Sequence, residues 1–447
     1  MAAMKTPKRE TGSGDAEDRG PTTQGDEASL EDVIRDHLRR IEGMAFAASV
    51  SLPILGLVNR DAVSRLDEEK FEEIDGLLAE ADEDEDGRIV PDHVGRRIAS
   101  ALEERDRELR HSARTTEGLR SVLETFVVAL VSHFGGFVEQ ALEAQYRARP
   151  KLMSGVRVDV GVGELVGEGR DHIGPLAREV ARLSCGKGYA EVMNEACARH
   201  KFKHPRDAVA GPWQVVEEVI ARRHVLVHRR GLADESYRKR MGRRAACQVG
   251  DRLAVNVEYL NNALLAFYGV ACAFGIGLWI TTTSRKEEDQ ADDVFGFVVD
   301  ESKRLLEDGL EGFAVALVGA ADNWMDRTSA ENTANALLNL ACALKRLGRV
   351  EEAVSVLARL KGLPGRELGP RHRLARKVVL GDYKAAAHEL KKSDDLEIDE
   401  LLDWPIFAEF RRQPVFVGAF KARFGETPDA ARARRANRTA PESEQVG

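Results

Sequence analysis

The chain of 447 residues is 43% hydrophobic and 32% charged, and its formal net charge at pH 7 is −9. Its length allows two or three buried cores, and its composition excludes a disordered protein. Its acidic balance excludes a protein whose whole surface binds nucleic acid, but it is compatible with a local basic site. The five cysteines are scattered without a CxxC pair, which argues against a disulfide framework or a thiolate zinc site and indicates a reducing, cytoplasmic environment.

The N-terminal segment, residues 1–28, is polar and charged. It contains no apolar stretch of the kind that a signal peptide needs, so we expect a disordered tail. Residues 29–113 are expected to form an N-terminal helical region that begins with an amphipathic helix over residues 30–41. The uncharged run that follows, residues 43–58, contains Pro53 and is too short to span a membrane comfortably.

The acidic segment DEDEDGRIVPDH joins two predicted helices and resembles an EF-hand loop. Asp82, Asp84 and Asp86 occupy its first, third and fifth positions. The twelfth position, where an EF-hand has a bidentate glutamate, is His93, and Pro91 interrupts the incoming helix. Without that glutamate a calcium ion loses two oxygen ligands. We therefore predict an acidic turn between helices, with a calcium-responsive switch as the alternative, and no other metal site.

A second helical domain is predicted over residues 114–285. A long helix begins near Thr115, and further helices follow the glycine-rich stretch of residues 151–174. The uncharged run of residues 263–280 is at the lower edge of the length that crosses a bilayer, about 20 residues. Its glycines fit a buried core helix equally well, so we expect a buried helix and no membrane association. The charged segment TTTSRKEEDQADD then marks a domain boundary near residue 285.

After this boundary the sequence contains a repeating pattern of large and small residues. In NALLNLACALKRLGRVEEAVSVLARL the pattern has the spacing of a tetratricopeptide helix pair. The residues that carry it are Leu337, Leu340, Ala341, Leu344, Gly348, Ala353 and Leu357. The segment ARKVVLGDYKAAAHEL repeats its last part, and Gly348 and Gly381 lie 33 residues apart, against about 34 in that family.

This region therefore resembles a tetratricopeptide (TPR-like) hairpin followed by a degenerate second hairpin. The resemblance implies a helical repeat domain over residues 286–425 that binds a protein partner or senses a trigger. Two repeats are few for such a stack, so helices over residues 294–318 and 401–425 are expected to cap it. Any other pair of helical hairpins would give the same architecture. Residues 426–447 are polar and arginine-rich, and we expect a disordered tail.

The segment RRHVLVHRRG, residues 222–231, places two histidines and several arginines in a helical apolar frame. Preceding valines and isoleucine supply an apolar face, and Gly231 supplies a helix stop. Around the helix axis, His224 and His228 lie about 100° and 140° from Arg223. The three side chains are therefore expected to face one cleft, and the other arginines would make that cleft positive.

Such a trio has a chemical use in cleaving RNA without a metal ion. The reaction needs a base that deprotonates the 2′-hydroxyl, an acid that protonates the leaving 5′-oxygen, and a cation that stabilises the charge on phosphorus. Histidine suits the first two roles because its pKa lies near neutral pH. Arginine suits the third because its planar guanidinium stays charged and binds phosphate oxygens in pairs.

The arrangement Arg223–His224–x3–His228 resembles the R-x4–6-H motif of HEPN domains (higher eukaryotes and prokaryotes nucleotide-binding domains), which often occur in metal-independent ribonucleases. The similarity extends to the end of the motif helix, where glycine, an acidic residue and an aromatic residue follow in ARRHVLVHRRGLADESY. A long amphipathic helix before the motif and an apolar helix after it also match the all-α HEPN bundle. The resemblance covers about residues 115–280.

This resemblance implies a HEPN-type helical bundle with a helical N-terminal extension and TPR-like hairpins after it. It implies that Arg223 and His228 are catalytic, and that His224 takes the polar position after the arginine, where asparagine is commonest. It also implies an endoribonuclease without a cofactor, acting on RNA as a toxin or antiviral-defence effector, and a homodimer, because HEPN sites usually form between two protomers. The basic residues proposed to contact RNA phosphates are Arg222, Arg229, Arg230 and His204.

The motif itself is short, and its context carries the identification. Five of the eleven histidines have an arginine five to seven positions upstream. Arg199–His200–x3–His204 even repeats the form, but it lacks an apolar face, so it predicts a solvated basic turn or an auxiliary phosphate contact. For Arg223 and the histidines after it, the alternative is a helix end where cations compensate the helix dipole. The chain would then be a catalytically inactive HEPN dimer with a TPR-like scaffold.

Overall fold

The chain folds into helices throughout the part that the structure, a computed structural model, describes. Within that part the only strand-like pairing is an isolated bridge between Leu232 and Arg252, so the all-α prediction is confirmed. The EF-hand-like residues Asp82, Asp84 and Asp86 and the tail of residues 1–28 lie outside it. The described residues are 29–64, 92–159, 172–186, 188–245, 247–282, 287–360, 363, 369–393 and 396–439.

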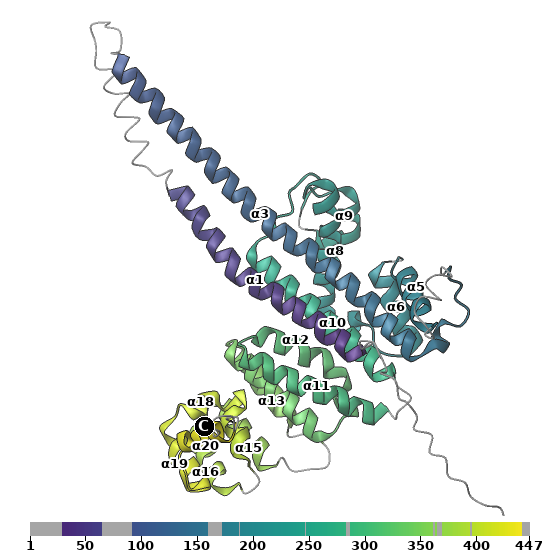
Figure 1. Cartoon of the computed structure of the whole chain (residues 1–447), viewed down its shortest axis with the longest axis vertical. Coiled ribbons are helices and arrows are strands. Elements are labelled where there is room, and N and C mark those ends of the chain that lie inside the picture. Colours follow the sequence, from purple (N-terminus) through teal and green to yellow (C-terminus); the bar gives the residue numbers. More distant parts are fainter. Residues whose placement is uncertain are drawn as a thin grey trace, which may run out of the picture.

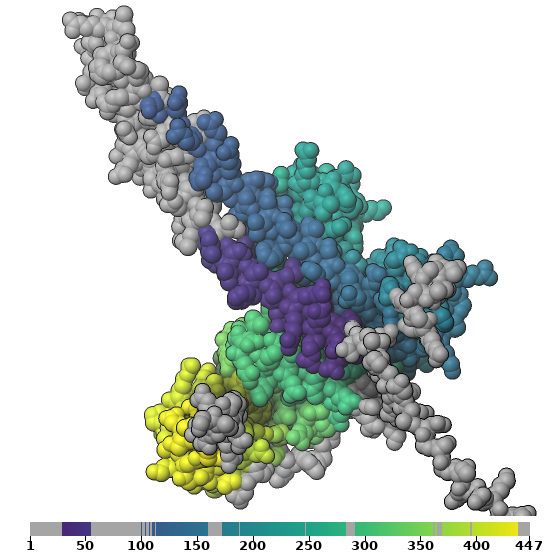
Figure 2. Space-filling model, viewed as in Figure 1, coloured from purple at the N-terminus to yellow at the C-terminus, as the bar shows by residue number. Residues whose placement is uncertain are grey.

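Two long helices, α1 and α3, lie side by side and project from the body of the molecule as an arm (Figures 1 and 2). Helix α1 spans Leu30–Ser64, and α3 spans Asp92–Ala148. Helix α1 is longer than predicted and continues through Pro53. The reason is that buried residues continue at helical spacing beyond the predicted end, with Ala48 and Leu52 extending the same buried face.

Helix α1 is an extension of the helical bundle that follows it and does not form a domain of its own. The boundary expected between residues 113 and 114 falls inside α3, which is continuous there. Helix α1 packs against both α3 and α10, and its His37 ring stacks on Phe137 of α3 at 4.3 Å between ring centroids. Helix α1 therefore shares the core of the helices that follow it.

Helix α10, Val257–Thr282, lies at the centre of this bundle. It packs against α1, α3, α8 and α12. Two glycines let neighbouring side chains approach its backbone closely. A Cβ at Gly275 would overlap Ile34, and a Cβ at Gly277 would overlap Phe202. The uncharged run of the sequence thus forms a tightly packed core helix.

Among the residues that the structure describes, two helical segments are long and apolar enough to cross a membrane, judged by length and composition alone. The most apolar window of residues 257–282 is 89% buried inside the protein, as expected for a core helix. The corresponding window of residues 113–148 is only 39% buried, so most of its residues are partly or fully exposed.

Shorter helices pack around α3 and α10 and complete the bundle. Helices α5 and α6 lie together beside one part of α3, and α8 and α9 lie beside another (Figure 1). These elements are η1 (Pro150–Met153), α5 (Ile173–Cys185), α6 (Tyr189–His200), α7 (Pro205–Ala208), α8 (Ala210–Arg229), α9 (Glu235–Met241) and η2 (Gly242–Arg244).

The C-terminal region begins with three consecutive helical hairpins. Their helices are α11 (Glu287–Glu307), α12 (Glu311–Ala321), α13 (Ala330–Arg346), α14 (Val350–Arg359), α15 (Pro370–Val379) and α16 (Tyr383–Lys392), with the turn η3 (Asp322–Arg327) before α13. Gly309, Gly348 and Gly381 turn the chain within the three hairpins, with φ angles of 72°, 77° and 77°. The single helix expected over residues 294–318 is therefore wrong, because Gly309 divides it into α11 and α12.

The chain continues through short helices that pack against these hairpins. They are α17 (Ile398–Asp403), η5 (Pro405–Phe407), α18 (Ala408–Arg411), α19 (Pro414–Phe424) and α20 (Pro428–Thr439). The disordered tail expected over residues 426–447 is wrong for α20. Its Ala431 is fully buried, and its Arg435 pairs with Asp399 at 3.1 Å and Asp403 at 2.8 Å.

The domain boundary expected near residue 285 does not separate two cores. Helix α10 packs against α12, where the rings of Tyr268 and Phe313 lie 4.8 Å apart. Glu42 of α1 accepts a hydrogen bond from Arg304 of α11 at 2.7 Å, so the arm is also tied to the C-terminal region. One continuous apolar core therefore runs through both helical regions.

Candidate functional site

The residues singled out by the sequence lie at the C-terminal end of α8. This helix is packed on two sides. Val216 and Val219 belong to the main core, whereas Ala221 and Val225 belong to a small second cluster with Tyr237 and other residues after the helix. Because these two faces are buried, the remaining face is left to carry polar side chains.

The end of α8 is built by the residues that follow the motif. Arg230 and Gly231 adopt left-handed backbone conformations with φ of 53° and 78°, and both of their N–H groups bond to the Val225 carbonyl. Asp234 then caps α9 by accepting a hydrogen bond from the Tyr237 backbone N–H at 2.8 Å. The glycine, acidic and aromatic residues after the motif therefore have local structural roles, ending one helix and starting the next.

Glu218 is the centre of a hydrogen-bond network that fixes α9 against α8. Its carboxylate accepts hydrogen bonds from the Tyr237 hydroxyl at 2.6 Å, the Tyr259 hydroxyl at 2.7 Å and the Arg222 Nε at 2.8 Å. Burial and the Glu218 carboxylate raise the pKa of both tyrosines, which keeps them as donors. Arg222 also donates to the Ala254 carbonyl at 2.5 Å and lies over the Tyr259 ring. The sequence predicted that Arg222 contacts a phosphate. In the structure its guanidinium is instead engaged with Glu218, Ala254 and Tyr259.

The structure brings the two motif histidines together. The rings of His224 and His228 lie 4.7 Å apart between centroids with an angle of 50° between their planes, and both residues are exposed. The Tyr237 backbone N–H and Arg229 lower the pKa of the Asp234 carboxyl. His224 lies close enough to Asp234 to make a smaller contribution in the same direction to the pKa of that carboxyl. The pair is therefore open to solvent at the end of the helix.

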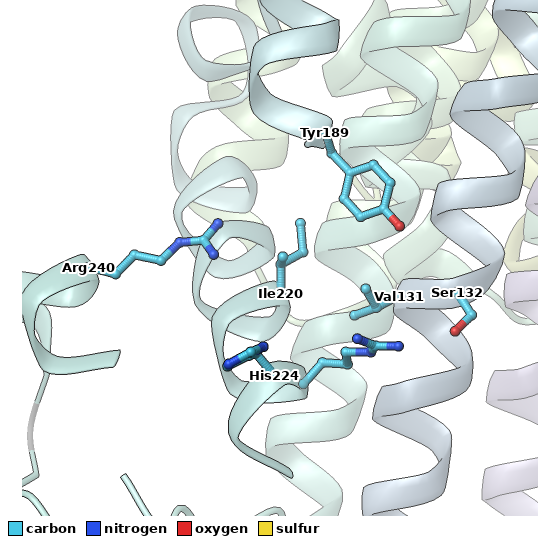
Figure 3. Close-up of a pocket in the computed structure, with 7 residues that line it drawn as sticks. Val131, Ser132, Tyr189, Ile220, His224 and Arg240 are labelled. Carbon is cyan, nitrogen blue, oxygen red and sulfur yellow. The ribbon is translucent and has the colours of Figure 1, made fainter. Parts of the chain in front are cut away.

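Arg223 and His224 open onto a pocket of about 250 Å³, which we call the Arg223 pocket (Figure 3). His228 is not among the residues that line it. The lining residues come from α3, α6, α8 and α9, and they are Val131, Ser132, Tyr189, Ile220, Arg223, His224 and Arg240. None of these side chains is acidic, so the pocket is cationic inside an acidic protein.

Tyr189, Ser132 and Val131 were not predicted as site residues. They lie far from the motif in sequence, and no local pattern marks them. The Tyr189 ring packs edge-on against Phe134 at 5.9 Å and directly over Gly135. Burial raises the pKa of its hydroxyl, and the charge of Arg223 partly offsets that effect. The hydroxyl therefore stays protonated at neutral pH.

The other predicted phosphate contacts lie outside this pocket. Arg229 is exposed and pairs with Asp234 at 3.4 Å, and Arg230 is exposed at the helix end. His204 is buried: its Nδ1 accepts a hydrogen bond from the Arg206 N–H at 2.9 Å, and its ring meets Trp213 edge-on at 4.7 Å. The solvated basic turn expected there is wrong, because aromatic packing draws His204 into the protein.

The chemistry available at the site is that of arginine and histidine. Among the residues that the structure describes, no group of three or more His, Cys, Asp or Glu side chains could hold a metal ion. Cys185 is the last residue of α5, near the pocket helix α6, but burial raises the pKa of its thiol to about 11, so it is a poor nucleophile. No known protein-family model, curated protein or solved structure matches the chain at a significant level.

Proposed function

We propose that this protein is a metal-independent endoribonuclease of HEPN type, with Arg223, His224 and His228 as its catalytic residues. The observation that supports the proposal most strongly is the pair of exposed imidazoles 4.7 Å apart at the edge of a pocket lined by Arg223 and by no acidic side chain. Such a pocket suits a phosphate group of RNA, since guanidinium groups bind phosphate oxygens in pairs.

In this mechanism one imidazole removes the proton from the 2′-hydroxyl of the substrate, and the 2′-oxygen forms a bond to phosphorus. The bond from phosphorus to the 5′-oxygen breaks, and the second imidazole, in its protonated form, gives a proton to that leaving oxygen. The products are a 2′,3′-cyclic phosphate and a 5′-hydroxyl. Arg223 stabilises the negative charge on the phosphate oxygens, because a cation that is already in place needs no reorganisation during the reaction.

We further propose that two copies of the chain form the active unit through α3. A groove of about 340 Å³ between α1 and α3 is lined by Met44, Ser121, Val122, Thr125, Phe126, Ala129 and His133. Ala129 and His133 are close on α3 to Val131 and Ser132 of the Arg223 pocket, so a second copy in the groove would lie beside the catalytic residues. Val122→Asp is expected to give a monomer by light scattering and to lower activity; a dimer in this variant would contradict the proposal.

The C-terminal hairpins are proposed to act as a TPR-like module that binds a partner protein or senses a trigger for RNA cleavage. Three consecutive hairpins with equivalent glycine turns support a repeat module. The HEPN resemblance supports a toxin or antiviral-defence role, and the scattered cysteines support a cytoplasmic location.

A scaffold without catalysis is the second candidate. It is favoured by the exposed apolar side of the arm, where the Phe46 side chain of α1 is 71% exposed. The two candidates differ in what the motif residues do in cells. A scaffold needs the groove and the hairpins but not His228.

Growth of cells that overproduce the protein separates the two functions. The ribonuclease is expected to stop growth and fragment cellular RNA, and His228→Ala should abolish both effects. His388→Ala is the matched control, since His388 is also an exposed histidine on a helix, α16. If His228→Ala and wild type behave identically, the catalytic proposal is wrong and the scaffold is favoured.

A further inference from the structure

The Arg223 pocket has two chemically different sides. Val131, Ile220 and the ring of Tyr189 form an apolar side, whereas Arg223 and Arg240 supply cationic groups and His224 supplies an imidazole. Figure 3 shows Tyr189 above Ile220 and Val131, with its hydroxyl toward α3, and Arg240 reaching in from α9. A ligand that fits both sides carries an anionic group joined to a flat apolar ring. A nucleotide has that chemistry.

The cationic side of the pocket contains an arginine, Arg240, whose charge is not paired with any carboxylate of the described residues. The neighbouring arginines 222, 229 and 244 each pair with a carboxylate, at 2.8, 3.4 and 3.2 Å. Arg240, by contrast, makes no ion pair with the residues that the structure describes. The Nε of Arg223 is buried and has no hydrogen-bond partner among them. A buried donor without a partner costs free energy, and an anion in the pocket would remove that cost.

The apolar side is held in place by the packing of α6 on α3. The Tyr189 ring lies over Gly135, where any side chain would overlap it, and its edge-on contact with Phe134 fixes its direction. Fixed aromatic rings bind nucleobases by stacking, with little dependence on sequence. Tyr189 thus presents a rigid aromatic surface beside the guanidinium of Arg240, which is unpaired within the described part of the chain.

The size of the pocket limits what can enter it. A volume of about 250 Å³ is just below the range of about 300–1,000 Å³ that is usual for ligand sites, so the pocket has room for no more than one nucleotide unit. A nucleobase that is stacked and paired in a duplex cannot enter, because it must first be splayed out of the strand. Single-stranded RNA is therefore the substrate class that the pocket suits.

We propose that the Arg223 pocket holds one unstacked nucleotide of single-stranded RNA, with its nucleobase against Tyr189 and its phosphate bound by Arg240. This inference rests on the proposed ribonuclease function and adds two residues to it. Arg240 and Tyr189 position the substrate, and stacking on Tyr189 is expected to hold the nucleobase with little preference among bases. They take no part in proton transfer.

Binding of small ligands to the full chain tests this inference without any cleavage. The probes are a nucleoside 3′-monophosphate and inorganic phosphate, measured by isothermal titration calorimetry. The wild type should bind the nucleotide at least about tenfold more tightly than phosphate, the effect of one base–aromatic contact. Tyr189→Ala should remove that difference and leave phosphate binding unchanged. Tyr189→Phe, which keeps the ring, should retain it.

The cationic side of the pocket is tested by two matched variants on α9, Arg240→Ala and Lys239→Ala. Arg240→Ala should weaken binding of both probes by about tenfold or more, as expected for the loss of a charge-assisted hydrogen bond. Lys239→Ala, an exposed cation next to it that does not line the pocket, should change neither. Equal binding of nucleotide and phosphate by the wild type, or equal effects of the two α9 variants, would overturn the inference.

Failure of the ribonuclease proposal would look different. If the wild type cleaves no RNA but still binds the nucleotide in a manner that depends on Tyr189 and Arg240, the pocket assignment stands and catalysis is wrong. If RNA is cleaved but neither probe binds as described, catalysis stands and the pocket assignment is wrong.

Discussion

Gly135 of α3 and Tyr189 of α6 are in direct contact, and a Cβ atom at residue 135 would overlap the tyrosine ring and hydroxyl. The next residue, Gly136, has nothing within 4 Å of the position where its Cβ would lie. These two neighbouring glycines therefore differ in what a side chain at each position would meet. One makes room for a side chain of the Arg223 pocket, and the other faces open space.

Gly135→Ala is expected to displace Tyr189 and to slow RNA cleavage. Gly136→Ala is the matched control, because both variants gain helix propensity, about 0.5–1 kcal/mol. Gly136→Ala should accordingly raise the free energy of unfolding and leave cleavage unchanged, whereas Gly135→Ala should lose that gain to the clash. Denaturant unfolding and cleavage rates measure both effects. Similar behaviour of the two variants would show that the position of Tyr189 does not matter.

Glu218→Gln is expected to loosen α9 from α8. The change removes the carboxylate that accepts hydrogen bonds from Arg222, Tyr237 and Tyr259, and it leaves a largely buried guanidinium without its ion pair. The expected loss is about 2–3 kcal/mol in the free energy of unfolding. Hydrogen exchange should show faster exchange at α9 first. Glu258→Gln, an exposed glutamate on α10, should have little effect on either measurement.

His37 is expected to make the protein less stable in weak acid. Burial, with the nearby charges of His133 and Arg40, lowers its pKa to about 3 from an ordinary value of 6.5. The folded state therefore leaves His37 neutral where the unfolded state protonates it. Its contribution to stability is complete above pH 6.5 and falls as the pH drops toward 3.

The size of this effect follows from the two pKa values. Between pH 7.5 and pH 5 the wild type should lose about 2 kcal/mol through this residue, and His37→Phe should lose that much less. Denaturant unfolding at the two pH values gives the comparison, and His388→Ala serves as an exposed control. An unchanged pH dependence in His37→Phe would contradict the assignment.

Helical periodicity predicted most of what is local in this fold. The all-α class, the buried character of α10 and the shared face of His224 and His228 all follow from the 3.6-residue repeat. The tetratricopeptide-like spacing singled out Gly348 and Gly381, which lie at hairpin turns. These features depend on residues close together in sequence, so one sequence is enough to find them.

What the sequence could not predict depends on packing between distant segments. Tyr189 enters the pocket only because α6 packs on α3 at Gly135. His204 looked solvated among charged neighbours, and its contact with Trp213 buries it. The arginine-rich α20 is held by Ala431 and by ion pairs to α17, contacts that composition alone does not reveal.

Cleavage of single-stranded RNA by the purified chain in excess chelator tests the central claim most directly. We predict that the wild type cleaves and leaves 2′,3′-cyclic phosphate ends. His228→Ala should lower the rate by a factor of about 10² to 10⁴, and Arg223→Ala by about 10² or more. His388→Ala should cleave at the wild-type rate. Cleavage by His228→Ala and Arg223→Ala at that same rate, or no cleavage of any RNA by the wild type, would contradict the account.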